Sequence, residues 1–216
     1  MTLLRNAARV AIFVICLAGL LRSPSAWAAD VQYVVKPIAE MKVTQLPNGP
    51  LYWRVENFPT LDQAKAAAGG YHWNPNTVSY DGSPSLTAEV AGKAWLFTLG
   101  PKGAATPGGT KVAEIGPVPP ISAPEYLLRV NYGSGPPGAE TPVHSHFGSE
   151  AFYVLTGKLG QRTPQGTSYV EAGHVMNGHA AGMTMEVFNA GTTDLTALIM
   201  FVVDATKPFS VPAKFK

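Results

Sequence analysis

The chain has 216 residues, of which 22 are glycine, 19 are proline and 14% are charged. This length is sufficient for one domain with a substantial core and for extensions to it. Abundant turn residues with few charges favour many short strands over a helical bundle, so we predict an all-β fold with a minor helical part. A formal net charge of only +2 argues against a nucleic-acid-binding protein.

The first 28 residues have the three parts of a secretory signal peptide. Arg5 and Arg9 form a positive segment, residues 10–21 form an apolar run, and Ala26-Trp27-Ala28 is a cleavage site of the A-x-A type. The apolar run is shorter than the about 20 residues of an ordinary membrane span. We therefore expect cleavage near Ala28, a periplasmic or secreted protein, and no stable membrane span after cleavage. An uncleaved amino-terminal anchor is the alternative.

Cleavage would also change the chemistry that the remaining chain can offer. It would remove Cys16, the only cysteine, and with it any disulfide or thiolate ligand. It would also remove Arg5, Arg9 and Arg22, leaving 13 of the 16 basic residues against 14 acidic ones. The net charge would then be −1, which again indicates neither nucleic acid nor an acidic membrane surface as a partner.

The segment that follows predicts one strand, one helix and a loop. Residues 51–55 are a candidate first strand. Residues 60–68 are predicted to form a helix, because Thr60 can cap its start, alanine favours helices, and Gly69-Gly70 can end it. Residues 71–84 are rich in Asn, Pro, Gly and Ser and predict a long loop.

Strands and turns then alternate to the end of the chain. Two runs, 151–157 and 195–203, are apolar on both faces and are predicted to be buried strands. Ala91-Gly92 is a predicted hairpin turn between two of the other strands. These other strands are expected at 85–90, 93–99, 111–115, 125–132, 161–163, 167–171 and 183–189.

Residues 138–157 contain the most informative pattern, Gly-x5-His-x-His-x3-Glu-x6-Gly. His144 and His146 are two residues apart and would share one face of a strand. Glu150 can reach back to that face if a turn forms at Phe147-Gly148-Ser149. Two imidazoles and one carboxylate can hold a divalent transition metal and leave other coordination positions open.

This pattern resembles the first motif of the cupin superfamily and matches it at every position, with Gly138 and Gly157 as its end residues. The resemblance implies an antiparallel jelly-roll β-barrel with an amino-terminal strand and loop extension. It also implies a homodimer, because cupins commonly pair edge strands. The expected parts are a signal peptide at 1–28, the extension with extra strands and a short helix at 29–120, the barrel core at 121–205 and a tail at 206–216.

The second cupin motif, Gly-x5-Pro-x-Gly-x2-His-x3-Asn, is degenerate in this chain. Gly182 and Asn189 fall into place, whereas Ala180 replaces the proline. Met185 stands at the position of the histidine that serves the family as fourth metal ligand.

Three interpretations of Met185 remain open. It can line an apolar pocket while the other three residues hold the metal, or it can be a soft ligand in a copper site near Met176 and Met183. Alternatively, the metal site has decayed, and His144 and His146 bind an organic ligand directly. Filling of the core is the usual role of methionine.

Three histidines lie outside the two motifs. His179 precedes the degenerate corner at the mouth of the predicted barrel, where it is a candidate fourth ligand or proton shuttle. His174 follows a glycine at a predicted turn and is expected to be exposed. His72 lies in a polar loop and is expected to have no role.

Glu150 has two candidate roles. As a ligand it would complete the metal triad. Unbound, beside the histidines, it would be a buried general base with a shifted pKa and thus the candidate catalytic residue. A structural polar cluster is the third interpretation, although a metal ion would offset the burial of a carboxylate. Aromatic residues that can shape an apolar pocket or fill the core are Phe152, Tyr153, Tyr169 and Phe188.

Two functions follow from the resemblance and the ligand set. The first is a metal-dependent oxidoreductase, of dioxygenase type, in which Fe, Mn, Ni, Cu or Zn binds a small organic molecule. Isomerases also occur among cupins, so the reaction type stays open. The second is a non-catalytic cupin that binds a small ligand and has a structural or decayed metal site.

Overall fold

The computed structural model describes residues 32–68 and 83–216. The predicted signal peptide, Cys16, His72 and most of the loop predicted at 71–84 lie outside these residues. Within them, the chain forms antiparallel sheets and one short helix, which confirms the predicted all-β fold. No helix in the two described ranges is long and apolar enough to cross a membrane.

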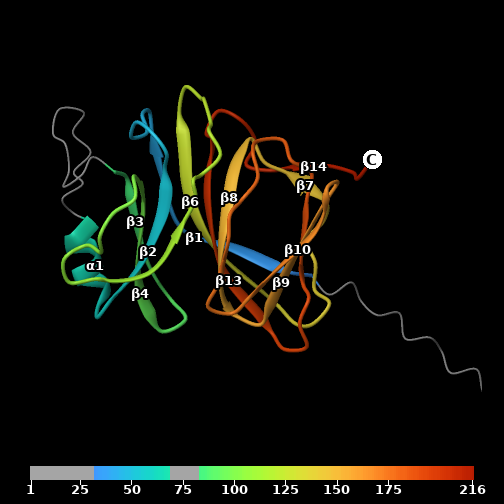
Figure 1. Cartoon of the computed structure of the whole chain (residues 1–216), viewed down its shortest axis with the longest axis horizontal. Coiled ribbons are helices and arrows are strands. Elements are labelled where there is room, and N and C mark those ends of the chain that lie inside the picture. Colours follow the sequence, from blue (N-terminus) through green and yellow to red (C-terminus); the bar gives the residue numbers. More distant parts are fainter. Residues whose placement is uncertain (1–31, 69–82) are drawn as a thin grey trace, which may run out of the picture.

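A five-stranded sheet forms the centre of the molecule (Figure 1). In spatial order its strands are β1 (Val34–Val43), β6 (Tyr126–Gly135), β13 (Leu195–Asp204), β8 (Gly148–Thr156) and β11 (Val175–Met176). β13 and β8 are the two runs predicted to be buried on both faces, and both lie inside this sheet as expected.

One face of the central sheet forms a core with a three-stranded sheet. That sheet consists of β10 (Gly166–Glu171), β9 (Lys158–Thr163) and β12 (Glu186–Asn189). Ile199 and Phe201 of β13 point into this core and meet Leu159 and Val187 from the other sheet. A short pair of strands, β7 (His144–Ser145) and β14 (Val211–Pro212), lies beside it. Two antiparallel sheets around one core are the arrangement implied by the cupin resemblance.

The opposite face of the central sheet is covered by a four-stranded amino-terminal sheet (Figure 1). Its strands, in spatial order, are β3 (Ser85–Val90), β4 (Lys93–Gly100), β2 (Tyr52–Phe58) and β5 (Thr110–Ile115). Trp53, Trp95 and Phe97 of this sheet pack against Met200 and Val202 of β13. Successive side chains of β13 point to opposite faces of the central sheet, so this strand contributes to two cores, one on each side.

The helix α1 (Leu61–Ala68) lies on the outer face of the amino-terminal sheet (Figure 1). Thr60 caps it as predicted, because its Oγ1 accepts a hydrogen bond from the backbone N–H of Gln63 at 3.2 Å. Ala64 is buried against Phe58 and Leu96. The stop signal predicted at Gly69-Gly70 lies outside the described residues.

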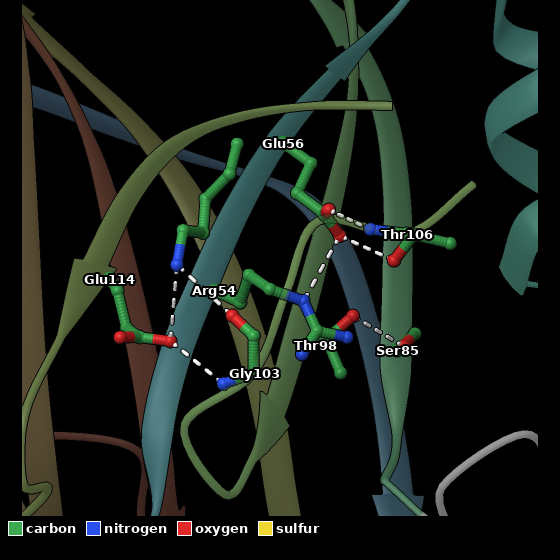
Figure 2. A network of polar contacts seen from close by, with 8 residues as sticks. Arg54, Glu56, Ser85, Thr98, Gly103, Thr106 and Glu114 are labelled. Carbon is green, nitrogen blue, oxygen red and sulfur yellow. Dashed lines mark hydrogen bonds and ion pairs between the residues drawn. The ribbon is translucent and has the colours of Figure 1, made fainter. Parts of the chain in front are cut away.

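A network of polar side chains fixes the loop before β5 to the same outer face (Figure 2). The Glu56 carboxylate is fully buried and accepts hydrogen bonds from the Thr106 N–H at 2.6 Å and the Thr106 hydroxyl at 2.8 Å. Arg54 Nε donates to it at 3.2 Å. Glu114 accepts from the backbone N–H of Gly103 at 3.1 Å. The three hydrogen bonds to Glu56 pair a carboxylate that would otherwise be costly to bury.

Strand β1 was not predicted, and its place in the fold bears on the predicted division of the chain. It belongs to the range 29–120, yet it pairs along its length with β6 of the central sheet. Its pairing is interrupted by a bulge between Pro37 and Ala39. The range boundaries themselves stay predictions.

Candidate metal and ligand site

The two motifs meet at one point of the structure. His144 on β7 forms an antiparallel bridge with Met185, in which the two residues exchange backbone hydrogen bonds of 2.9 and 2.8 Å. The residue that stands at the histidine position of motif two is therefore directly opposite the first histidine of motif one. Met185 is 2% exposed.

The two motif-one histidines hold the same ring atom, Nδ1, against a backbone carbonyl. Nδ1 of His144 lies 2.7 Å from the carbonyl oxygen of Pro142, and Nδ1 of His146 lies 2.7 Å from that of Phe209. Because a carbonyl only accepts, Nδ1 carries the proton and Nε2 keeps its lone pair. The rings are 4.9 Å apart between centroids. This is the arrangement in which a backbone acceptor orients a metal-ligating imidazole.

Glu150 lies on β8 beside the second histidine. Its Oε2 is 3.9 Å from Nε2 of His146, and both side chains are buried. Burial raises the pKa of Glu150 to about 8, against which the hydrogen bond from Gln161 acts. Burial also lowers the pKa of His146 to about 4, so this imidazole is neutral at physiological pH and able to bind a metal.

Gln161 on β9 is the site residue that the sequence analysis missed. Its side-chain Nε2 donates to Oε1 of Glu150 at 2.6 Å and lies 3.4 Å from the sulfur of Met185. Its Oε1 is 3.0 Å from Nε2 of His179. Gln161 is 1% exposed, and through these contacts it links the buried Glu150 and Met185 to the half-buried His179.

The other predicted candidates lie at different depths. His179 is half-buried, and burial lowers its pKa. Its Nε2 lies beside Oε1 of Gln161, and its role as ligand or proton shuttle stays a prediction. His174 is exposed, as expected. Met176 is part of the core, whereas Met183 is half-buried.

The four aromatic residues predicted to shape a pocket or fill the core also differ in where they lie and in how deeply they are buried. Phe152 lines a cavity beside His144 and His146, and Tyr153 packs against the opposite core. Tyr169 is exposed and meets Phe188 edge to face on the outside of the three-stranded sheet.

A cavity of about 380 Å³ opens beside the histidines and Glu150. Its walls are mostly apolar and come from both sheets and from the tail. The tail supplies Phe209, whose ring lies 5.0 Å from that of His146 and 4.9 Å from that of Phe201 between centroids. The lining residues are Tyr33, Val35, Asn131, Thr141, Pro142, Val143, His144, His146, Glu150, Phe152, Val187, Ile199, Phe201, Phe209, Ser210 and Pro212.

The chemistry of the donor set fits a divalent transition metal. Two imidazoles present Nε2 lone pairs, and two ligands at about 2.0–2.2 Å from one ion can be separated by up to about 4.4 Å, which the His146–Glu150 pair satisfies. Within residues 32–68 and 83–216, however, no three His, Cys, Asp or Glu side chains are gathered closely enough to form a complete ion site. One carboxylate oxygen of Glu150, Oε1, accepts the Gln161 hydrogen bond, and the other, Oε2, faces His146.

Comparisons with known proteins give structural matches only. No protein-family model matches the chain. No curated protein is similar to it in sequence. Among solved structures, a cupin superfamily protein from Desulfitobacterium hafniense is 14% identical over 36% of this chain and 68% of its own, with a TM-score of 0.33.

Two further solved structures match with similar extents. A conserved protein from Streptococcus pyogenes is 22% identical over 35% of this chain and 64% of its own, with a TM-score of 0.32. An oxalate oxidase is 21% identical over 40% of this chain and 46% of its own, with a TM-score of 0.34. The matched region thus spans less than two thirds of both of these chains. The sheet arrangement and the meeting of the two motifs confirm the cupin resemblance at the level of the fold.

Proposed function

Taking a cupin fold as the premise, we propose that this chain is an exported protein that binds a divalent transition metal through His144, His146 and Glu150. We further propose that it acts on a small organic molecule held in the adjoining cavity, as a metal-dependent oxidoreductase. The observation that carries the proposal is the cavity itself, whose polar end consists of two oriented imidazoles and a buried carboxylate.

Each of the three residues has a distinct part in this proposal. The two imidazoles would bind through Nε2, with their Nδ1 protons held by backbone carbonyls. Glu150 would bind as a carboxylate and neutralise part of the charge of the ion. A metal bound there would supply redox or Lewis-acid chemistry to a ligand in the cavity. The apolar walls would exclude water from that ligand.

A non-catalytic binding protein is the second candidate, and one observation favours it. Met185 stands at the position of the family's fourth ligand, and its sulfur already has a neighbour, the amide nitrogen of Gln161 at 3.4 Å. A site with three protein ligands, or with none, could retain the cavity and bind a small molecule without turning it over. Uptake of dioxygen in the presence of a panel of small organic molecules would separate this candidate from the oxidoreductase.

Elemental analysis of the purified full chain tests the metal site. We expect about one equivalent of Fe, Mn, Ni, Cu or Zn per chain, and loss of most of it in His144→Ala and His146→Ala. His174→Ala is the matched control, because His174 is exposed and its Nδ1 also lies near a carbonyl oxygen, that of Ala172.

Two results would overturn the metal proposal. The first is a wild-type chain that takes up none of the five metals when each is supplied in turn. The second is a His146→Ala chain that retains the same metal content as wild type. Export and the homodimer are likewise proposals, which cell fractionation and the mass of the purified protein in solution would test.

A further inference from the structure

The short loop that follows β11 lies directly against two of the candidate metal ligands. A Cβ atom on Gly178 would overlap the backbone carbonyl of Glu150, so only glycine lets the loop approach β8 this closely. Farther along the loop, the N–H of Gly182 donates to the backbone carbonyl of His146 at 2.8 Å. The loop is therefore held on motif one at two points, and His179 lies between them.

The imidazole of His179 contacts the candidate site through one amide. Its Nε2 lies 3.0 Å from Oε1 of Gln161. The other end of that amide, Nε2 of Gln161, lies 2.6 Å from Oε1 of Glu150 and 3.4 Å from the sulfur of Met185. His179 is half-buried, whereas Gln161 is 1% exposed. A chain of contacts thus runs from the loop to the buried carboxylate.

The direction of these hydrogen bonds follows from the chemistry of the groups. A side-chain amide has an NH2 end that donates and an oxygen that accepts. As a metal ligand Glu150 is a carboxylate, which only accepts, and the thioether of Met185 also only accepts. The NH2 end therefore faces these two groups, and the amide oxygen faces His179. Nε2 of His179 must then carry the proton, whereas His144 and His146 carry theirs on Nδ1.

This tautomer bears on the two roles predicted for His179. The ring nitrogen that faces the site donates a hydrogen bond and has no free lone pair for a metal ion. A proton that moved from His179 to Glu150 along this chain would have to pass through the amide of Gln161, which is not a titratable group. The contact with the amide itself is the role that this geometry leaves.

We propose that His179 is a positioning residue of the candidate metal site, whose Nε2–H holds the Gln161 amide with its NH2 end toward Glu150. A turned amide would place its oxygen against the carboxylate and its NH2 group against the N–H of His179, so both contacts would be repulsive. Groups that orient a metal ligand in this way raise the affinity for the metal. The inference rests on the proposed function, in which Glu150 is a metal ligand.

Zinc affinity of the full chain, measured by competition with a chelator, tests this role. His179→Leu removes the donor and should weaken zinc binding about 3–10-fold, the effect of one lost hydrogen bond. His179→Gln supplies a side-chain N–H of similar reach and should restore most of the affinity. His174→Leu is the matched control, because His174 is exposed and the substitution is the same. It should bind zinc as wild type does.

A double-mutant cycle separates positioning from direct contact with the ion. In a Gln161→Leu chain no amide remains to be oriented, so the further change His179→Leu should cause no additional loss of zinc affinity. A second loss of the same size in the double variant would overturn the inference, because His179 would then act on the metal independently of Gln161.

The tautomer of His179 supplies a readout that needs no metal. At about pH 9 the histidines of the metal-free protein are neutral and Glu150 is ionised. Nitrogen NMR with ring-labelled histidine should show the proton on Nε2 of His179 and on Nδ1 of His144 and His146. The signals that disappear in His179→Gln identify this residue. A proton on Nδ1 of His179 would overturn the inference.

Failure of this inference differs from failure of the proposed function. A wild-type chain that takes up no metal would overturn the proposed function, and the NMR result would then decide whether His179 orients the amide. If the wild-type chain binds zinc and His179→Leu binds it equally well, the inference is wrong, while the ligand set of His144, His146 and Glu150 stands.

Discussion

At the scale of single residues, Gln161 is the side chain on which the position of Glu150 depends. It is buried and donates to Oε1 of Glu150 at 2.6 Å. Gln161→Leu would remove that donor at nearly constant volume and leave the carboxylate without its hydrogen bond. Because residues that orient metal ligands affect affinity strongly, we expect metal affinity to fall about 10–100-fold, measured by competition with a chelator.

Gln165 provides the control for this change. It lies in the exposed turn between β9 and β10, so Gln165→Leu makes the same substitution far from the carboxylate. Its metal affinity should equal that of wild type. A Gln161→Leu chain with unaltered affinity would show that Glu150 needs no support from this residue, or that Glu150 is not a ligand.

The raised pKa of Glu150 predicts a pH-dependent stability of the metal-free protein. Burial raises this pKa from 4.5 to about 8, so the folded state holds the proton more strongly than the unfolded state. The resulting stability is fully present below about pH 4.5 and is lost as the pH rises through about 8. From Glu150 alone we expect the free energy of unfolding to fall by on the order of 3 kcal/mol between pH 5 and pH 8, whereas the lowered pKa of His146 acts in the opposite direction up to about pH 6.5.

Urea denaturation at the two pH values measures this loss. Glu150→Gln cannot ionise and should show little of it, whereas Glu89→Gln, an exposed glutamate on β3, should show the same loss as wild type. An identical pH dependence in wild type and Glu150→Gln would contradict the assignment of the raised pKa to Glu150.

The sequence revealed the candidate ligands but not the residues that orient them. His144, His146 and Glu150 are recognisable because their types and spacing form a motif. Gln161 is one polar residue in an ordinary strand, and only the fold brings it to Glu150. Phe209 contributes a backbone carbonyl, which any residue type would provide equally well. No sequence pattern could therefore distinguish either residue.

At the scale of elements, the buried Glu56 on β2 anchors the loop before β5 to the amino-terminal sheet (Figure 2). Glu56→Leu would leave Arg54 and the Thr106 N–H without this buried acceptor. Loss of one partner from such a buried cluster typically costs about 3–5 kcal/mol. We expect a decrease of that size in the free energy of unfolding, measured with urea, and no change in metal affinity.

Glu114 on β5 is the comparison for Glu56. It also binds this loop, through the backbone N–H of Gly103, but its side chain is partly exposed. Glu114→Leu should therefore cost only about 1 kcal/mol or less. Equal losses for the two variants would mean that burial does not set the strength of these contacts.

The strands that the sequence predicted are those with a local signal. β3 has the predicted bounds, and the turn after it has positive φ at both Ala91 (52°) and Gly92 (69°), as a tight hairpin requires. β1 was missed because it is an edge strand whose outer residues are exposed and whose run contains Pro37 and a bulge. Its pairing with β6 depends on a partner far along the chain, which no local pattern contains.

At the scale of the whole molecule, the cavity is completed by the tail, whereas the stability of the fold depends on the two cores of the central sheet. β14 pairs with β7 beside His144, and Phe209 contacts both His146 and the guanidinium of Arg129, the latter at 4.2 Å from the ring centroid. The core between the central and amino-terminal sheets contains no residue of the tail. Metal affinity and the free energy of unfolding should therefore respond differently when the tail is truncated.

Truncation after Lys207 tests this separation. It removes the carbonyl that orients His146 and the ring that covers the cavity, so metal affinity should fall about 10–100-fold, as for other losses of a ligand's supporting contact. The urea midpoint should fall only slightly, because the core shared with the amino-terminal sheet is intact and the tail adds only the partly buried Phe209 to the other core. Truncation after Ala213 retains β14 and the hydrogen bond from the Ala213 N–H to the Val143 carbonyl, and should preserve both properties. If truncation after Lys207 instead unfolds the protein, the tail is part of the folding core. The metal site could then not be weakened without loss of the fold.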